Sequence, residues 1–128
     1  MVMTENNLVT VSNFVQAVEA FIQHIKNNYD IHDVIIFGSH ARGTQTDQSD
    51  VDIAIILKEN PVIYKKNHNE RVKIALDMAD IAFDILLEKG ILIEAFPLWQ
   101  DEMEQPDYFS NPLLIQNIKR EGLSLHSI

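Results

Sequence analysis

The sequence predicts a single α/β (α+β) domain over residues 1–128, with a small mixed sheet of about four strands and flanking helices. A short unbroken apolar run at 34–37, rich in β-branched residues, is typical of a strand buried on both faces. Period-2 alternation at 50–57 is typical of a second strand, and apolar residues at helical spacing on either side of the pair indicate helices. A chain of 128 residues can bury a core without disulfides, and this one has no cysteine.

The first helix is expected at 12–29, because apolar residues recur there every three or four positions. These are Phe14, Val18, Phe21 and Ile25. The strand at 34–37 ends at Gly38, and the polar segment 39–48 that follows has room for a turn or a short helix.

The second half of the chain continues the alternation of strands and helices. The expected elements are a strand at 50–57, a helix at 64–79, strands at 81–87 and 91–98, an acidic loop at 99–110 and a closing helix at 111–122. The strand at 81–87 rests on alternation alone, with Asp84 on one face and four apolar residues on the other.

The composition excludes several classes of function. Ten lysines and arginines against 19 aspartates and glutamates give a formal net charge of −9, which argues against direct binding of a nucleic-acid backbone. The absence of cysteine excludes thiol nucleophiles and cysteine-ligated metals. No apolar run is long enough to span a membrane and the first residues lack the features of a signal peptide, so a cytoplasmic protein is expected.

One group of residues indicates a binding or catalytic site: Gly38-Ser39 at the end of one strand, followed by Asp50 and Asp52 at the start of the next. Glycine lets a ligand approach the backbone closely, and the Ser39 hydroxyl can donate to an anion. Asp50 and Asp52 project from one face of a strand, and two carboxylates so close repel unless a cation lies between them. Mg²⁺ fits, because it binds carboxylates together with substrate phosphates.

Asp84 is a candidate for a third carboxylate from a neighbouring strand. Its apolar flanks indicate an internal strand, where a charge is costly to bury without a partner. Both interpretations of Asp84, a metal ligand or a charge at a strand edge, stay open at this point.

The segments GSHARG at 38–43 and SDVDIA at 49–54 resemble the signature of the nucleotidyltransferase superfamily of the DNA polymerase β type. Within that superfamily the chain is similar to the minimal nucleotidyltransferases, and the likeness covers nearly its whole length. FDILL at 83–87 and IKREG at 118–122 contribute to it. The resemblance implies the nucleotidyltransferase fold.

The resemblance also implies a role for each motif residue. Asp50 and Asp52 would hold two Mg²⁺ ions, and Asp84 would complete the metal site. Gly38 and Ser39 would contact the triphosphate of ATP. Arg42 would support the turn or the phosphates. Five cations follow the aspartate strand, of which most are expected on a helix surface and one or two at the triphosphate: Lys58, Lys65, Lys66, Arg71 and Lys73.

Proteins similar to this one act as antitoxins of type VII toxin–antitoxin pairs and transfer AMP from ATP to a tyrosine of a HEPN-domain ribonuclease toxin. The resemblance therefore implies a protein adenylyltransferase with a HEPN partner, although the sequence does not indicate which base is preferred. Two alternatives stay open: a small-molecule (antibiotic) nucleotidyltransferase, and an antitoxin that neutralises its partner by binding alone.

Overall fold

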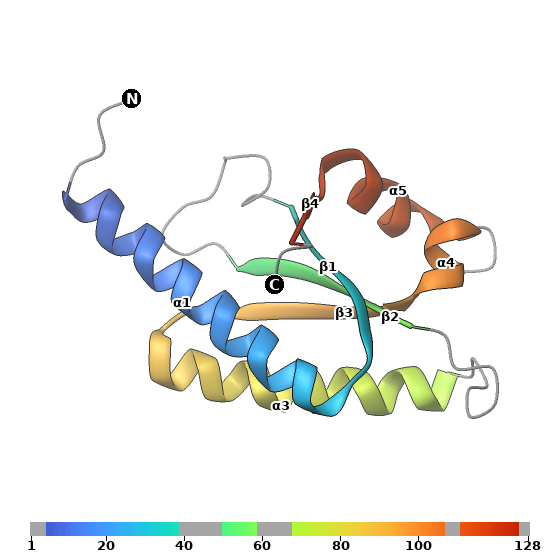
Figure 1. Ribbon diagram of the computed structural model, residues 1–128, viewed down its shortest axis with the longest axis horizontal. Helices are drawn as coiled ribbons and strands as arrows, with labels where there is room; N and C mark the ends of the chain where they lie inside the picture. The colour runs from blue at the N-terminus through green and yellow to red at the C-terminus, as the bar shows by residue number, and fades with distance from the viewer. Residues whose placement is uncertain (1–4, 39–49, 59–67, 107–110, 126–128) are drawn as a thin grey trace.

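The computed structural model describes residues 5–38, 50–58, 68–106 and 111–125, which form helices on both sides of one sheet (Figure 1). Its elements in chain order are α1 (Glu5–Asn28), β1 (Ile31–Phe37), β2 (Val51–Leu57), α3 (His68–Lys89), β3 (Ile93–Trp99), α4 (Gln100–Glu104), α5 (Pro112–Glu121) and β4 (Leu123–Ser124). None of the described helices combines the length and hydrophobicity of a membrane-spanning segment.

Within the described residues the sheet has four strands, in the order β3-β2-β1-β4. β1 pairs antiparallel with β2 and with β4, whereas β2 and β3 are parallel. The parallel pair is possible because α3 carries the chain back along the sheet between them. The expected small mixed sheet with flanking helices is confirmed.

Two apolar clusters lie on opposite faces of the sheet because side chains alternate along each strand. α1 and α3 pack on one face around buried residues such as Phe21, Ile53 and Met78. On the other face α5 covers Phe37, Ala54 and their neighbours. Figure 1 shows α1 and α3 together on one side and α4 and α5 on the other.

The expected strand at 81–87 is wrong, because these residues form the second half of α3. Ile81 and Ile85 continue the helical spacing of buried Met78 and face the core, whereas Phe83 and Leu87 are exposed. The alternating apolar pattern therefore arises from two different faces of one helix. Asp84 is exposed on α3 and belongs to no strand.

Most other expected elements appear with shifted ends. The strands expected at 34–37, 50–57 and 91–98 correspond to β1, β2 and β3, and the segment expected at 99–110 as a loop contains the last residue of β3 and then α4. The closing helix is confirmed as α5, whose first turn is capped by the Asn111 side chain. The segment 39–48 lies outside the described residues.

Candidate active site

Three chain segments bring functional residues to one edge of the sheet. β1 runs antiparallel to β2, so the end of β1 lies beside the start of β2, and Phe37 pairs with Asp52. β3 starts at the same edge because it is parallel to β2, and its Glu94 pairs with Asp52. Residues paired across neighbouring strands share a face of the sheet. Asp52 and Glu94 are therefore adjacent on the face that α5 partly covers.

Gly38 allows the chain to turn immediately behind Asp52. Its φ of 75° lies in the left-handed region, which glycine adopts without steric cost. A Cβ added at Gly38 would overlap the Asp52 carboxylate, with Oδ2 far inside contact distance and Cγ at 3.4 Å. A glycine is thus required here both by the backbone angle and by the carboxylate beside it.

Three carboxyl groups meet at this edge: Asp50, directly before β2, Asp52 on β2 and Glu94 on β3. Partial burial and then the negative charges of Asp52 and Asp50 raise the pKa of the Glu94 carboxyl, and hydrogen bonding to both aspartates adds to this effect. Mutual repulsion of this kind is what a bound cation relieves.

The donor set fits Mg²⁺ in its chemistry, since all three groups offer hard carboxylate oxygens. In the described part of the chain, however, no three acidic, histidine or cysteine side chains are already arranged as metal ligands. Holding a metal would require the three carboxyl side chains to turn their oxygens toward a common ion.

The structure brings together only some of the residues that the sequence proposes for the site. Gly38, Asp50 and Asp52 meet at the sheet edge, whereas Asp84 lies on the exposed surface of α3. Ser39 and Arg42 lie outside the described residues. Sequence reasoning missed Glu94, although a single acidic residue within the apolar run 91–98 was a usable signal.

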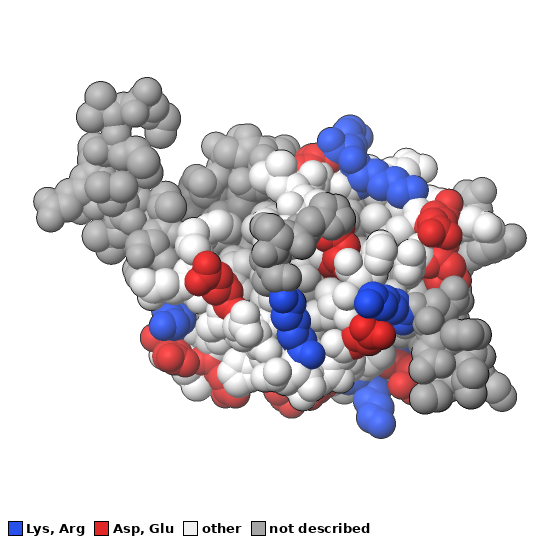
Figure 2. Space-filling view, in the orientation of Figure 1, with Lys and Arg blue, Asp and Glu red and all other residues white. Residues whose placement is uncertain are grey.

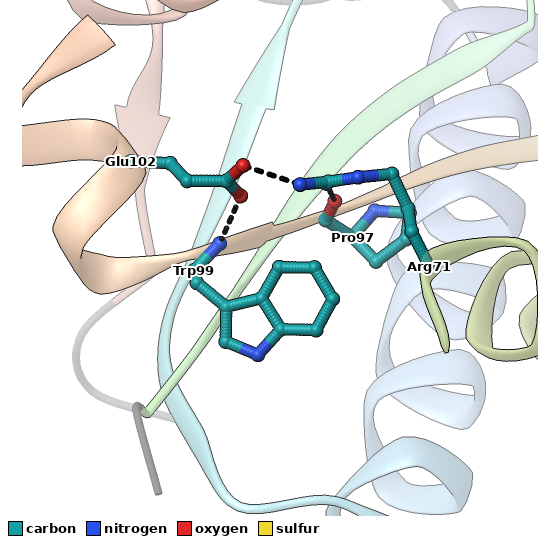
Figure 3. Close-up of polar contacts among 4 residues, drawn as sticks. All are labelled: Arg71, Pro97, Trp99 and Glu102. Atoms are coloured by element: carbon teal, nitrogen blue, oxygen red, sulfur yellow. Dashed lines mark hydrogen bonds and ion pairs between the residues drawn. The ribbon is translucent and has the colours of Figure 1, made fainter. Parts of the chain in front are cut away.

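Arg71, one of the cations proposed for the triphosphate, has a structural role at the opposite end of β3 (Figure 3). Its guanidinium donates to the Pro97 carbonyl oxygen at 2.6 Å and to the Glu102 carboxylate. It also lies 4.7 Å from the centre of the Trp99 ring. Glu102, which is buried, accepts from the Trp99 N–H at 3.0 Å as well. This ion pair therefore connects α3 with the end of β3 and the start of α4.

Acidic and basic side chains are interspersed on the face shown in Figure 2, and the described residues form no continuous basic patch there. This pattern agrees with the net charge of −9. The feature that distinguishes the site is instead its cluster of carboxyl groups, which suits a cation together with an anionic substrate.

Comparisons with known proteins indicate the family and the fold of the chain. Residues 19–103 match the family described as "Polymerase beta, Nucleotidyltransferase". One relative is "Putative protein adenylyltransferase MJ1379" from Methanocaldococcus jannaschii, which is 27% identical over 64% of this chain and 82% of its own length.

Two solved structures share the fold. The crystal structure described as "a putative nucleotidyltransferase from Sulfolobus solfataricus" has a TM-score of 0.61 at 17% identity and covers 97% of this chain and 89% of its own. A toxin–antitoxin crystallised with AMP-PNP has a TM-score of 0.50 at 17% identity and covers 89% of this chain and 70% of its own. At these identities the likeness concerns the fold alone.

Proposed function

Because the chain belongs to the polymerase β nucleotidyltransferase family, we propose that it transfers AMP from ATP to a tyrosine hydroxyl of a HEPN-domain ribonuclease toxin and so acts as its antitoxin. The observation that carries this proposal is the cluster of Asp50, Asp52 and Glu94 beside the Gly38 turn. It places three acidic oxygen donors at a bend where a nucleotide's phosphates can approach the backbone.

Asp50, Asp52 and Glu94 are the residues that would hold two Mg²⁺ ions at this edge. When bound, the ions lower the pKa of the acceptor hydroxyl and neutralise charge on the leaving pyrophosphate. Glu94 replaces Asp84 as the third carboxylate in this proposal, because Glu94 pairs directly with Asp52 across β3 and β2, whereas Asp84 lies on α3.

In the reaction, the acceptor oxygen forms a bond to the α-phosphorus of ATP, and the bond from that phosphorus to the departing pyrophosphate breaks. The proton of the hydroxyl passes to a carboxylate oxygen of Glu94. A tyrosine is a favourable acceptor, because a phenol with a pKa of about 10 loses its proton far more readily than an aliphatic alcohol. Ser39 and Arg42 are proposed to contact the triphosphate on the side of Gly38.

Two findings support a protein as the acceptor. Relatives of this chain carry the name protein adenylyltransferase, and a toxin–antitoxin bound to AMP-PNP shares the fold. The acidic character of the chain favours a partner with a basic surface, which it would attract at a salt-dependent rate.

The test is to co-express the chain with a HEPN-domain protein encoded beside it and to measure the partner's intact mass. We expect the partner to gain whole AMP units on a tyrosine, and Asp52→Asn to abolish the gain. Modification of an aminoglycoside in place of the protein would support the small-molecule alternative. If the Asp52→Asn variant still neutralises the toxin fully, the chain neutralises its partner by binding alone and AMP transfer is not required.

A further inference from the structure

The outer edge of β3 is closed along one half by the Arg71–Glu102 pair. β3 is the outermost strand of the described sheet, next to β2 only. Near the end of β3, Arg71 donates to the Pro97 carbonyl oxygen and Glu102 accepts from the backbone N–H of Trp99 (Figure 3). Proline has no backbone N–H that could pair with another strand. The Pro97 carbonyl oxygen and the Trp99 backbone N–H, which point away from β2, therefore already have hydrogen-bond partners. A further strand cannot pair with β3 through these groups.

The first half of the same edge has no such cover among the described residues. Val51 donates to the Leu92 carbonyl oxygen at 2.9 Å, so the backbone groups of Leu92 and Glu94 face β2. Since N–H and C=O directions alternate along a strand, the groups of Ile93 and Ala95 face outward, as those of Pro97 and Trp99 do. Two donors and two acceptors are thus presented beside Glu94.

An apolar groove lies next to this open half-edge. It has a volume of about 380 Å³ and runs between α3 and β3, lined by Ala75, Ala79, Ala82 and Phe83 from the helix and by 92–96 from the strand. Phe83 is 56% exposed and Leu92 37% exposed, so large apolar surface is left in water. Exposed apolar surface that adjoins an open strand edge is a common peptide-binding arrangement.

A strand added at Ile93 and Ala95 would place its own side chains alternately on the two faces of the sheet. Those on the α3 side would enter the groove, while those on the other side would lie on the face of Asp52 and Glu94. One extended segment would in this way bury apolar residues and hold the residue between them against the carboxyl cluster.

The charges around this edge favour a basic segment. Glu94 borders the groove, its carboxyl lies with Asp50 and Asp52 on the other face of the sheet, and Asp80 and Glu88 are exposed on α3. With a net charge of −9 on the chain, a segment carrying lysines or arginines at its ends is attracted and an acidic one is repelled.

We propose that the acceptor protein docks as an extended, basic segment that adds a strand to the Ile93–Ala95 half of β3, with an apolar residue on each side of the acceptor tyrosine inserted into the α3–β3 groove. This inference rests on the proposed function, since it names how that function's acceptor is bound. The Arg71–Glu102 pair sets its register by closing the remainder of the edge.

The binding test uses the peptide Lys-Lys-Ile-Tyr-Ile-Lys-Lys, without nucleotide, added to the isotope-labelled full chain and followed by NMR. We expect the largest amide shifts at Ile93, Ala95 and the groove-lining residues of α3, with slowed hydrogen exchange at Ile93 and Ala95. The same peptide N-methylated at its three central residues, and one with glutamates for lysines, should produce much smaller shifts. Shifts that map to another face, or that the N-methylated peptide reproduces, overturn the proposal.

The kinetic test fills the groove by Ala79→Arg and uses Gln23→Arg on α1 as the control with the same charge change. Both positions are exposed on helices, so both variants are expected to fold. In AMP transfer to the HEPN partner, Ala79→Arg should raise KM about tenfold or more and leave kcat nearly unchanged, and Gln23→Arg should change neither. An unchanged KM in Ala79→Arg would rule out the groove as the docking site.

The two tests separate this inference from the proposed function. Peptide binding at Ile93 and Ala95 without any AMP transfer would leave the docking edge standing and would overturn the proposed function. AMP transfer that Ala79→Arg does not affect, with shifts away from β3, would leave the proposed function standing and overturn the docking edge.

Discussion

Asp52 of β2 and Glu94 of β3 stand opposite each other in the parallel register, on the same face of the sheet. Adjacent strands lie about 4.8 Å apart, so two acidic side chains at this position repel each other unless a proton or a cation is shared. The raised pKa of Glu94 reflects partial burial together with this repulsion. The pairing explains how a small sheet can concentrate negative charge beside the turn at Gly38.

Millimolar Mg²⁺ or Mn²⁺ should raise the melting temperature of the chain, because a ligand that binds only the folded state stabilises it by mass action. Asp52→Asn removes a proposed ligand and should abolish most of this dependence. Differential scanning fluorimetry across a magnesium series, with Asp30→Asn as an exposed control far from the cluster in sequence, measures both. A wild-type melting curve that does not move over the series would contradict a metal site at this edge.

Glu94→Gln should stabilise the metal-free protein at neutral pH. A carboxyl whose folded-state pKa is raised contributes stability that is fully present below its ordinary value of 4.5 and is lost as pH rises through the raised value. Glutamine stays neutral throughout, so the variant's stability advantage should be absent below the ordinary pKa, grow as pH rises from the ordinary to the raised pKa, and stay constant above it. Urea unfolding in the presence of a chelator, repeated across pH, measures this gap, and a gap independent of pH would contradict the assignment.

Gly38→Ala should cost more stability than Gly90→Ala. Both glycines have a positive φ, 75° and 74° respectively, so the backbone penalty is matched. A Cβ at Gly90 meets open space, whereas one at Gly38 collides with the Asp52 carboxylate. We expect a loss of about 1 kcal/mol for Gly90→Ala and about 2–4 kcal/mol for Gly38→Ala in urea unfolding. Equal losses would mean that Asp52 is not held against Gly38.

Much of this site could be predicted from the sequence, because Gly38, Asp50 and Asp52 lie close together along the chain. The glycine after a buried strand and the aspartates opening the next one lie within 15 residues, and antiparallel pairing of β1 with β2 brings them together. The third carboxylate depends on which later segment becomes the parallel neighbour of β2. A helix with apolar residues on two faces produces the same alternation at 81–87 as a strand, so the sequence predicts Asp84 as the third carboxylate, whereas the structure places Glu94 beside Asp52.

Two other features could not be predicted, for related reasons. β4 has only two residues, and its place in the sheet depends on α5 delivering them to Ile35 and Ile36. The Arg71–Glu102 pair joins residues 31 positions apart, and no local pattern marks Arg71 as different from the lysines near it in the sequence. Long-range partners of this kind are set by tertiary packing, whereas helix and strand periodicity are set locally.

Arg71→Met should destabilise the fold by about 2–3 kcal/mol, because it leaves the buried Glu102 carboxylate without its cation. Adding Glu102→Gln to that variant should recover part of the loss, since a neutral amide can still accept from Trp99. The control is Lys58→Met, which removes a pair with Asp30 whose side chains are 53% and 77% exposed, and it should cost less than about 0.5 kcal/mol. Equal losses in urea unfolding would contradict a structural role for the pair.

The most direct test compares AMP transfer to the HEPN partner by Glu94→Gln and by Asp84→Asn, each set against the wild-type chain. Each substitution replaces one carboxylate by its amide, so both variants lose one negative charge while the side chain keeps its length. Loss of a proposed metal ligand should reduce the rate by at least about 100-fold in Glu94→Gln, and Asp84→Asn should transfer at close to the wild-type rate. Full activity in Glu94→Gln, or loss of activity in Asp84→Asn alone, would contradict the three-carboxylate site formed by β2 and β3.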